Sequence, residues 1–286
     1  MVEGRPVRAI QQIQLGTVLG SEREARQTLR LLKEAGYEAF ELNGFMIRPT
    51  PWIVRALTRV AGMPAGKGGK LDWPALVREA DLEVVAVHED LGGIERDPAA
   101  VVAQARALDT GHVVITGTYR FDHSDEDAVR DLARRLNAAG RRLADDGLRL
   151  LYHNHNAEFR RVASGAMAYD LVLDQTDPEL VGCELDCYWA ASAGADVVRL
   201  IERLGDRLVL MHLTDRGATA RGRTITPIVA FDTVELGSGT MDLPRIVAAA
   251  KAVGVRAVIL ETHRNWSGGS PVRSFQLSAP FMAEHV

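Results

Sequence analysis

Short apolar runs alternate with longer amphipathic segments along most of this chain of 286 residues. The short runs are typical of buried strands, and the amphipathic segments have the spacing of helices with one apolar face. A glycine separates a helical segment from the next apolar run at four places, where it suits the position after a helix C-terminus: Gly36, Gly147, Gly205 and Gly254. This alternation predicts a parallel sheet joined by crossover helices.

Eight strands are expected on this pattern. They cover residues 8–16, 37–42, 82–88, 111–116, 148–152, 180–186, 207–213 and 255–261. Eight strand–helix units in one chain of this length fit a (β/α)8 TIM barrel better than a doubly wound sheet, which usually has fewer strands and a glycine-rich phosphate turn after the first. No such turn follows the first expected strand. We therefore expect an α/β fold in which residues 1–286 form a single TIM-barrel domain.

Helices are expected between these strands, the first beginning at a capping box formed by Ser21 and Glu24. The expected helical segments are 21–35, 72–80, 98–108, 124–146, 169–175, 195–204, 242–253 and 271–285. Two stretches interrupt the pattern. Residues 43–73, with several prolines and glycines, are interpreted as an insertion after the second strand that covers the barrel mouth and includes a short helix at 52–60. Residues 214–240 are expected to be irregular.

Composition and charge exclude several kinds of partner. The 34 Lys and Arg residues are interspersed with 38 Asp and Glu, for a net charge of -4, and no basic stripe with interleaved aromatics indicates nucleic-acid binding. No apolar run is near the roughly 18 residues of a membrane span, and the first residues lack the hydrophobic region of a signal peptide. We therefore expect no membrane contact and a cytoplasmic location. Cys183 and Cys187 are interpreted as small packing residues, since they match no disulfide or zinc pattern.

Charged and imidazole side chains collect where the expected strands end. These residues are Glu41, His88, His153, His155, Asp186, His212 and Glu261. Each alone has a plain interpretation as a satisfied polar residue at the end of a buried strand. Together they indicate a site, because all strand C-terminal ends of a barrel open on one face, where active sites of this architecture lie. Carboxylate oxygen and imidazole nitrogen without thiolate suit a divalent cation.

Four segments resemble the sugar phosphate isomerase/epimerase family of xylose-isomerase-like TIM barrels, which is related to inosose dehydratases, ketose 3-epimerases and the endonuclease IV fold. They are Tyr152-His-Asn-His155 with Glu158-Phe159, Glu184-Leu-Asp186-Cys-Tyr188-Trp189, His212-Leu-Thr-Asp215, and Val234 to Leu243. The match is strongest from Asp131 to Glu261. The resemblance implies one divalent cation at the mouth of the barrel, usually held by two Glu, one Asp and one His.

Carried over to this chain, that ligand set includes Asp186, His212 and Glu261. The fourth ligand is His153 or Glu158, and His153 is preferred because it lies at the end of an expected strand. Mn²⁺ is the expected ion, although Mg²⁺, Co²⁺ and Zn²⁺ also suit these ligands. Where relatives often have Lys, this chain has Thr214, which removes a cation that could meet a substrate phosphate or carboxylate.

The implied chemistry is proton abstraction next to a carbonyl of a keto-sugar or related polyol, with the cation stabilising an enediolate. The expected catalytic residues are Glu261, His155 and His153, and the expected substrate-binding residues are Glu41, His88, Glu158 and Trp189. If the proton returns to the neighbouring carbon, the enzyme is an isomerase, and if it returns to the opposite face of the same carbon, the enzyme is an epimerase. Loss of a β-substituent instead gives a dehydratase or lyase acting on an inosose or 3-keto-glycoside.

Two other kinds of function are weaker alternatives. An endonuclease IV-like hydrolase would need a basic DNA-binding face, which the net charge disfavours. A non-catalytic sugar-binding subunit is disfavoured by the near-complete ligand set, and homo-oligomerisation stays open. Gly237-Ser-Gly239 is a candidate anion-binding turn, although an ordinary tight turn is the favoured interpretation.

Overall fold

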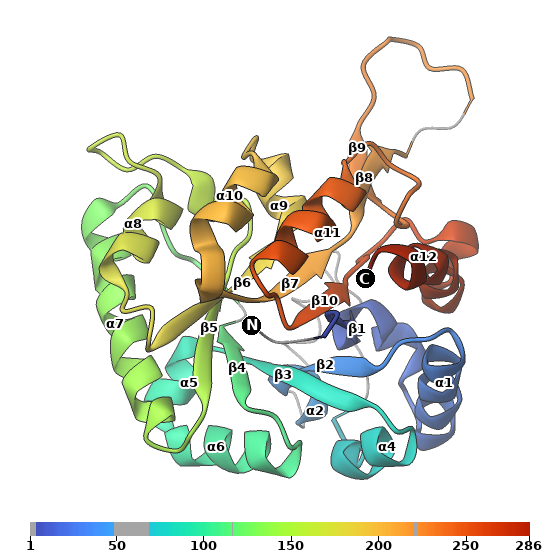
Figure 1. The fold of residues 1–286 in the computed structure, drawn as a ribbon, viewed down its shortest axis with the longest axis horizontal. Helices are drawn as coiled ribbons and strands as arrows, with labels where there is room; N and C mark the ends of the chain where they lie inside the picture. The colour runs from blue at the N-terminus through green and yellow to red at the C-terminus, as the bar shows by residue number, and fades with distance from the viewer. Residues whose placement is uncertain (1–3, 49–68, 116, 220–221) are drawn as a thin grey trace.

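A closed barrel of eight parallel strands forms the centre of the computed structural model, which describes residues 4–48, 69–115, 117–219 and 222–286 (Figure 1). Around the ring the strands lie in the order β1-β10-β7-β6-β5-β4-β3-β2, which confirms the expected (β/α)8 barrel. The barrel strands are β1 (Val7–Gln11), β2 (Ala39–Asn43), β3 (Glu83–Glu89), β4 (His112–Ile115), β5 (Arg149–His153), β6 (Val181–Asp186), β7 (Leu208–Leu213) and β10 (Ala257–Leu260).

Helices surround the barrel on the outside (Figure 1). Many of them begin at an Asp or Ser whose side chain accepts a backbone N–H of the first turn; Ser21, for example, accepts from Glu24 N at 3.3 Å. The described helices are α1 (Glu22–Glu34), α2 (Gly44–Ile47), α4 (Trp73–Glu79), α5 (Leu91–Arg96), α6 (Pro98–Ala107), α7 (Glu126–Ala144), α8 (Ala168–Gln175), α9 (Cys187–Ser192), α10 (Val197–Leu204), α11 (Leu243–Ala252) and α12 (Pro271–His285).

Two apolar clusters pack against opposite faces of the strands. On β5, Leu150 and Tyr152 belong to the large cluster under the helices, whereas Leu151 belongs to a smaller one inside the barrel. The small cluster is an apolar plug made of Ala9, Ala39, Val85, Ala86, Val114, Leu151, Val209, Leu210, Ala257 and Ile259. Because side chains alternate along a strand, the next inward position lies two residues further on. On several strands that position holds a polar residue, so the plug forms the floor of a polar mouth.

The prediction of a first strand over residues 8–16 is wrong beyond Gln11, where β1 ends. A 3-10 helix, η1 (Gln12–Val18), follows instead. The Gln11 side chain accepts the backbone N–H of Ile13 at 3.1 Å, which turns the chain out of the sheet. The mixed polar and apolar pattern of this segment did not distinguish a strand from a short helix.

The expectation that 214–240 is irregular is also wrong in part. An antiparallel hairpin of β8 (Asp215–Ala218) and β9 (Phe231–Val234) lies within it and extends from the barrel near α11 and α12 (Figure 1). Helices α5 and α9, which directly follow β3 and β6, were not expected. Most of the expected insertion 43–73, with its helix at 52–60 and its covering of the mouth, lies outside the described residues. The single-domain assignment stays a prediction.

The expected role of Gly147 is confirmed. This glycine follows α7 with a φ of +76°, a left-handed conformation that costs a residue with a Cβ about 1 kcal/mol. Cys183 and Cys187 are buried and free, as expected for packing residues. Among the described residues, no helix is both long and apolar enough to cross a membrane.

Candidate functional site

The barrel brings the predicted site residues together at its C-terminal mouth. His153 lies two residues after the plug residue Leu151 on β5, and His212 lies two residues after the plug residue Leu210 on β7. Glu261 lies just past β10, two residues after Ile259, and Glu41 follows Ala39 on β2. The alternation of a strand thus places an imidazole or a carboxylate directly above each of these apolar plug residues.

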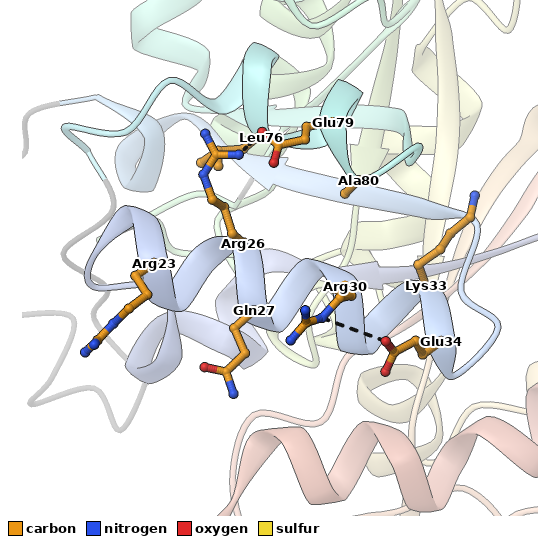
Figure 2. Close-up of a pocket in the computed structure, with 9 residues that line it drawn as sticks. All are labelled: Arg23, Arg26, Gln27, Arg30, Lys33, Glu34, Leu76, Glu79 and Ala80. Carbon is orange, nitrogen blue, oxygen red and sulfur yellow. Dashed lines mark ion pairs between the residues drawn. The ribbon is translucent and has the colours of Figure 1, made fainter.

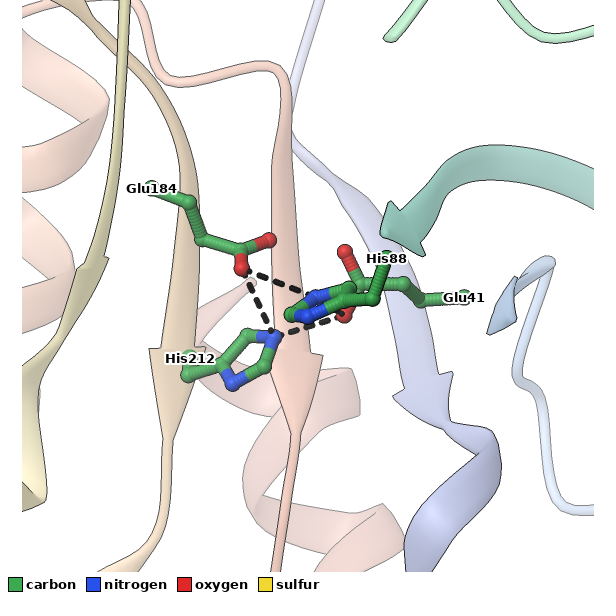
Figure 3. A group of neighbouring side chains, drawn as sticks. All are labelled: Glu41, His88, Glu184 and His212. Carbon is green, nitrogen blue, oxygen red and sulfur yellow. Dashed lines mark hydrogen bonds and ion pairs between the residues drawn. The ribbon is translucent and has the colours of Figure 1, made fainter. Parts of the chain in front are cut away.

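One group within this mouth consists of Glu41, His88, Glu184 and His212 (Figure 3). All four side chains are buried, and one nitrogen or oxygen of each lies within 4.8 Å of the others. His212 Nε2 lies 2.6 Å from Glu41 Oε2 and 3.4 Å from Glu184 Oε2. These residues come from β2, β3, β6 and β7, so the group exists only once the barrel has closed.

A second group consists of His153, Asp186 and His212, again within 4.8 Å of one another. His212 Nδ1 faces this side, 2.8 Å from Glu261 Oε2 and 3.9 Å from Asp186 Oδ2. Three of the four ligands expected from the resemblance therefore form this group, the fourth, Glu261, contacts it through His212, and the two groups share His212.

The donor atoms of the mouth fit a divalent cation. His153 Nδ1, Glu41 Oε1 and both carboxylate oxygens of Glu184 are buried and make no hydrogen bond. A native protein leaves few buried polar atoms without a partner. Carboxylate oxygens and imidazole nitrogens are ligands for Mn²⁺, Co²⁺ and Zn²⁺, so these atoms have the chemistry that a cation would satisfy.

The charges of the mouth oppose the effect of burial on the pKa of His88 and add to its effect on the pKa of Asp186. Burial lowers the pKa of His88, but Glu41 and Glu184 outweigh it and raise that pKa to about 10. Burial and the neighbouring Glu261 raise the pKa of Asp186 to about 7. Because cation ligands must give up their protons, a cation bound here would compete with protons, and its binding would weaken as the pH falls.

A cavity of about 310 Å³ opens above this centre, a size that suits a small molecule. Its lining residues include His88, His153, His155, Glu158, Trp189 and Glu261, which are six of the predicted site residues. Glu41, Asp186 and His212 are buried in the wall and are not among the described lining residues. The cavity is therefore lined both by candidate cation ligands and by groups that could meet a substrate.

His155 lies beyond the end of β5 rather than on it, since the strand ends at His153. The two rings remain close, with centroids 5.0 Å apart. Asn154 makes the turn: its Oδ1 accepts the N–H of Asp186 at 2.9 Å, and its Nδ2 donates to the Asp186 carbonyl at 3.2 Å. Burial, and then His153, lowers the pKa of His155 to about 3, so this imidazole is neutral at physiological pH.

Glu158 also lines the cavity and belongs to neither ligand group. Its Oε2 accepts the backbone N–H of His155 at 3.0 Å, and its Oε1 lies 3.6 Å from His123 Nε2. Burial raises the pKa of this carboxyl group to about 7. It is therefore close to half protonated at neutral pH and can donate or accept a hydrogen bond.

The candidate anion turn at Gly237–Gly239 is already filled by a carboxylate of the chain itself. Asp215 Oδ2 accepts the N–H groups of Gly237 at 3.1 Å and Gly239 at 2.8 Å. Its Oδ1 accepts those of Met241 at 3.1 Å and Arg216 at 2.8 Å. The turn does bind an anion, but that anion is internal, and it fixes the hairpin to the start of α11.

A larger groove, of about 680 Å³, lies on the outer surface between α1 and α4 (Figure 2). Arg23, Arg26, Arg30 and Lys33 line it, and Arg26 pairs with Glu22 and Glu79 while Arg30 lies 3.8 Å from Glu34. Ion pairs of this exposed kind contribute little energy. The groove is on the helical exterior and away from the strand ends, so we do not assign the chemistry to it.

Sequence reasoning missed Glu184, Asn154, His123 and His263. Glu184 had a usable signal, because it lies two residues before Asp186 on β6 and so shares its inward face. His263 Nε2 lies 3.1 Å from Glu261 Oε1, and it likewise follows that residue by two positions. Asn154 and His123 act through contacts with distant segments, for which the sequence has no local signal.

The chain belongs to the xylose isomerase-like TIM barrel family, whose model matches residues 29–285. It is similar to the rhizopine catabolism protein MocC of Rhizobium meliloti, with 24% identity over 277 residues that cover 89% of this chain and 79% of that protein. It is also similar to the inosose dehydratase of Lactiplantibacillus plantarum, with 22% identity over 287 residues that cover 94% and 91%.

A solved structure of a sugar phosphate isomerase/epimerase from Parabacteroides distasonis has the same fold, with a TM-score of 0.77 at 22% identity. The match covers 98% of this chain and 94% of that one. The resemblance drawn from the strand-end motifs is therefore confirmed at the level of family and fold.

Proposed function

We propose that this chain is an enzyme that uses a divalent cation to move a proton next to a carbonyl of a small keto-sugar or polyol. The observation that carries the proposal is the convergence of Glu41, Glu184, Asp186 and Glu261 with several imidazoles above the apolar plug, directly below a cavity of small-molecule size. The names of the relatives, which include an isomerase/epimerase and an inosose dehydratase, support the same class of chemistry.

The proposed ligands are His153, Asp186, His212 and Glu261, and Mn²⁺ is the proposed ion. When bound, a divalent cation supplies Lewis acidity, which stabilises the negative charge that develops on a carbonyl oxygen as a neighbouring proton leaves. Two hydrogen bonds position Asp186 as a ligand. Its backbone N–H donates to Asn154 Oδ1, and its side-chain Oδ1 accepts the N–H of Trp189 at 2.8 Å. The ligand positions are thus fixed by the fold before any ion binds.

The proposed proton carriers face the cavity from β5 and the segment after it. His155 is neutral at physiological pH, so its free nitrogen can accept a hydrogen bond or, from a substrate that a bound cation would acidify, a proton. Glu158, with a pKa raised to about 7 by burial, can donate one to a substrate oxygen. The indole N–H of Trp189 is buried without a hydrogen bond and offers a further donor to a sugar hydroxyl.

The proposed substrate is not phosphorylated. The anion turn at the mouth is filled by Asp215, and Thr214, where a Lys would supply a cation, donates its hydroxyl to the Val234 carbonyl at 3.2 Å. Both features take away groups that would otherwise meet a phosphate.

A dehydratase or lyase acting on an inosose or a 3-keto-glycoside is the second candidate. The observation that favours it is the similarity to an inosose dehydratase over 94% of this chain. The same base would remove the same proton, and the two reactions differ only in whether a β-substituent then leaves.

Metal analysis followed by proton NMR in D₂O tests the proposal. Protein carrying Mn²⁺ should exchange a carbon-bound proton of a keto-sugar or inosose for deuterium, and chelation should abolish the exchange. An isomerase or epimerase would give a rearranged sugar. A dehydratase would release water, and a lyase acting on a 3-keto-glycoside would release an alcohol. Metal-free protein with unchanged activity would refute the assignment.

Two matched variants separate the roles of neighbouring histidines. His155→Gln should keep the cation and the fold while turnover falls by about 10²-fold, the scale of a lost acid or base. His153→Gln should instead lower the cation occupancy measured by elemental analysis. The reverse outcome would exchange the two roles and make Glu158 the candidate ligand.

A further inference from the structure

We infer that the mouth holds a second divalent cation, bound by Glu41, His88 and Glu184 next to the first. This inference rests on the proposed function, which by itself needs only one cation. The three residues come from β2, β3 and β6, and Figure 3 shows their side chains converging with that of His212.

The distances between these side chains are those of ligands around an ion. His88 Nε2 lies 3.2 Å from Glu41 Oε2 and 3.1 Å from Glu184 Oε2. Yet His88 Nε2 and both oxygens of Glu184 make no hydrogen bond, because the atoms are near but not aligned for one. Metal–ligand bonds of about 2.1 Å separate neighbouring ligands by about 3.0 Å in an octahedron and about 3.4 Å in a tetrahedron. The observed spacing fits atoms that point at a common cation.

His212 cannot serve both cations. A neutral imidazole has one free lone pair, and the other nitrogen carries a proton. If Nδ1 binds the first cation beside Asp186, the Nε2–H can donate to Glu41 Oε2, 2.6 Å away. His212 then orients a carboxylate of the second site, as metal-bound histidines commonly do. Three protein ligands remain for the second cation, with coordination positions left for water or substrate.

A second cation would also balance charge in the mouth. Glu41, Glu184, Asp186 and Glu261 are each less than 10% exposed, with values of 0%, 0%, 3% and 7%. Within the described part of the chain, the ion-pair partners given for these four carboxylates are all histidines, with no Lys or Arg. One divalent cation neutralises two of the four charges. Burying the other two without compensation would be costly, and either protons on His88 and His212 or a second cation bound by His88 and Glu184 removes that cost.

Glu184 lies between the two positions. The same Oε2 atom that is 3.1 Å from His88 is 3.0 Å from His153 Nδ1, a proposed ligand of the first cation. A carboxylate in this place suits the paired sites in which two cations lie roughly 3.5–4 Å apart. The mixed oxygen and nitrogen ligands select Mn²⁺, Co²⁺ or Zn²⁺ over Mg²⁺ and Ca²⁺.

The experiment is a titration of chelator-treated full-length protein with Mn²⁺, followed by elemental analysis and electron paramagnetic resonance. Wild-type protein should bind two equivalents, and its resonance spectrum should show magnetic coupling between neighbouring Mn²⁺ ions. His88→Gln should bind one equivalent with an uncoupled spectrum, and so should Asp186→Asn. His123→Gln is the matched control, a mouth histidine outside both ligand groups, and should keep two equivalents. Circular dichroism checks the fold of each variant, and the wild-type spectrum tests the inference without any substitution.

The outcomes separate this inference from the proposed function. A single uncoupled equivalent that survives His88→Gln but not Asp186→Asn overturns the second site and leaves the proposed function standing; protonated His88 and His212 would then balance the charge. A single equivalent lost only in His88→Gln overturns both the second site and the proposed ligand set. No bound metal in the wild type overturns the metal-dependent function as well.

Discussion

Loss of the Asp215 carboxylate should destabilise the protein more than loss of an ordinary helix cap. Asp215 is buried, and its two oxygens accept four backbone N–H groups, those of Arg216, Gly237, Gly239 and Met241. A buried donor left without a partner costs about 1–3 kcal/mol. Gly237 is exposed and the other three donors are only partly buried, so water can satisfy some of them, and Asp215→Ala should lower the free energy of unfolding by about 2–4 kcal/mol.

Urea unfolding followed by circular dichroism measures this effect. Asp242→Ala is the matched control, since the Asp242 side chain caps α11 through a single N–H, that of Arg245 at 3.4 Å, and should cost about 1 kcal/mol. Asp215→Asn should fall between them, because its amide would turn an NH₂ group toward two of the donors. If Asp215→Ala shifts the midpoint no more than Asp242→Ala does, the turn at 237–241 does not depend on this carboxylate and the reasoning is refuted.

Three further predictions concern single positions. Gly147→Ala should destabilise by about 1 kcal/mol, because only the φ of +76° opposes a Cβ there and no atom lies within 4 Å; an unchanged melting temperature would contradict this. Gly117→Ala should both destabilise and reduce turnover, because φ is +144° and the new Cβ would lie 3.2 Å from the His155 ring; unchanged kinetics would show that the ring moves freely. His112 lies at the opposite end of the barrel, on β4, where burial and then Arg256 lower its pKa to about 4 from the ordinary 6.5. The folded state therefore binds this proton less tightly than the unfolded chain, and the stability is full above pH 6.5 and is lost as the pH falls toward 4. His112→Gln should flatten the fall in melting temperature across that window, and an unchanged slope would exclude His112 as its source.

The barrel was predictable because its signals are local and repeated. Glycines such as Gly147 after helices, and charged residues at strand ends such as Asp186, follow from the chain's own periodicity. The end of β1 and the hairpin β8–β9 were not predictable in this way. Their backbones are redirected by side-chain contacts, Gln11 to Ile13 in one case and Asp215 to Gly239 in the other, and neither produces a hydrophobic period.

The site was predictable in its elements but not in its grouping. Alternation along the strands places His153 and Glu261 at the mouth, but it does not say that His212 presents its two nitrogens to two different sets of carboxylates. That division depends on the orientation of one ring, which the surrounding strands fix together. Glu184 shows the limit most clearly, since its sequence position marks it as inward-facing while only the closed barrel places it between two histidines.

The apolar plug has a consequence for the order in which molecules enter and leave. Because Leu151, Leu210 and Ile259 close the barrel below the polar mouth, the described residues leave the proposed cation ligands accessible from the cavity side. A substrate in that cavity would lie across the path by which the proposed ion leaves. If the proposed cation is bound there, it should load first and leave last, and a chelator should strip it more slowly from protein saturated with substrate or product than from free protein.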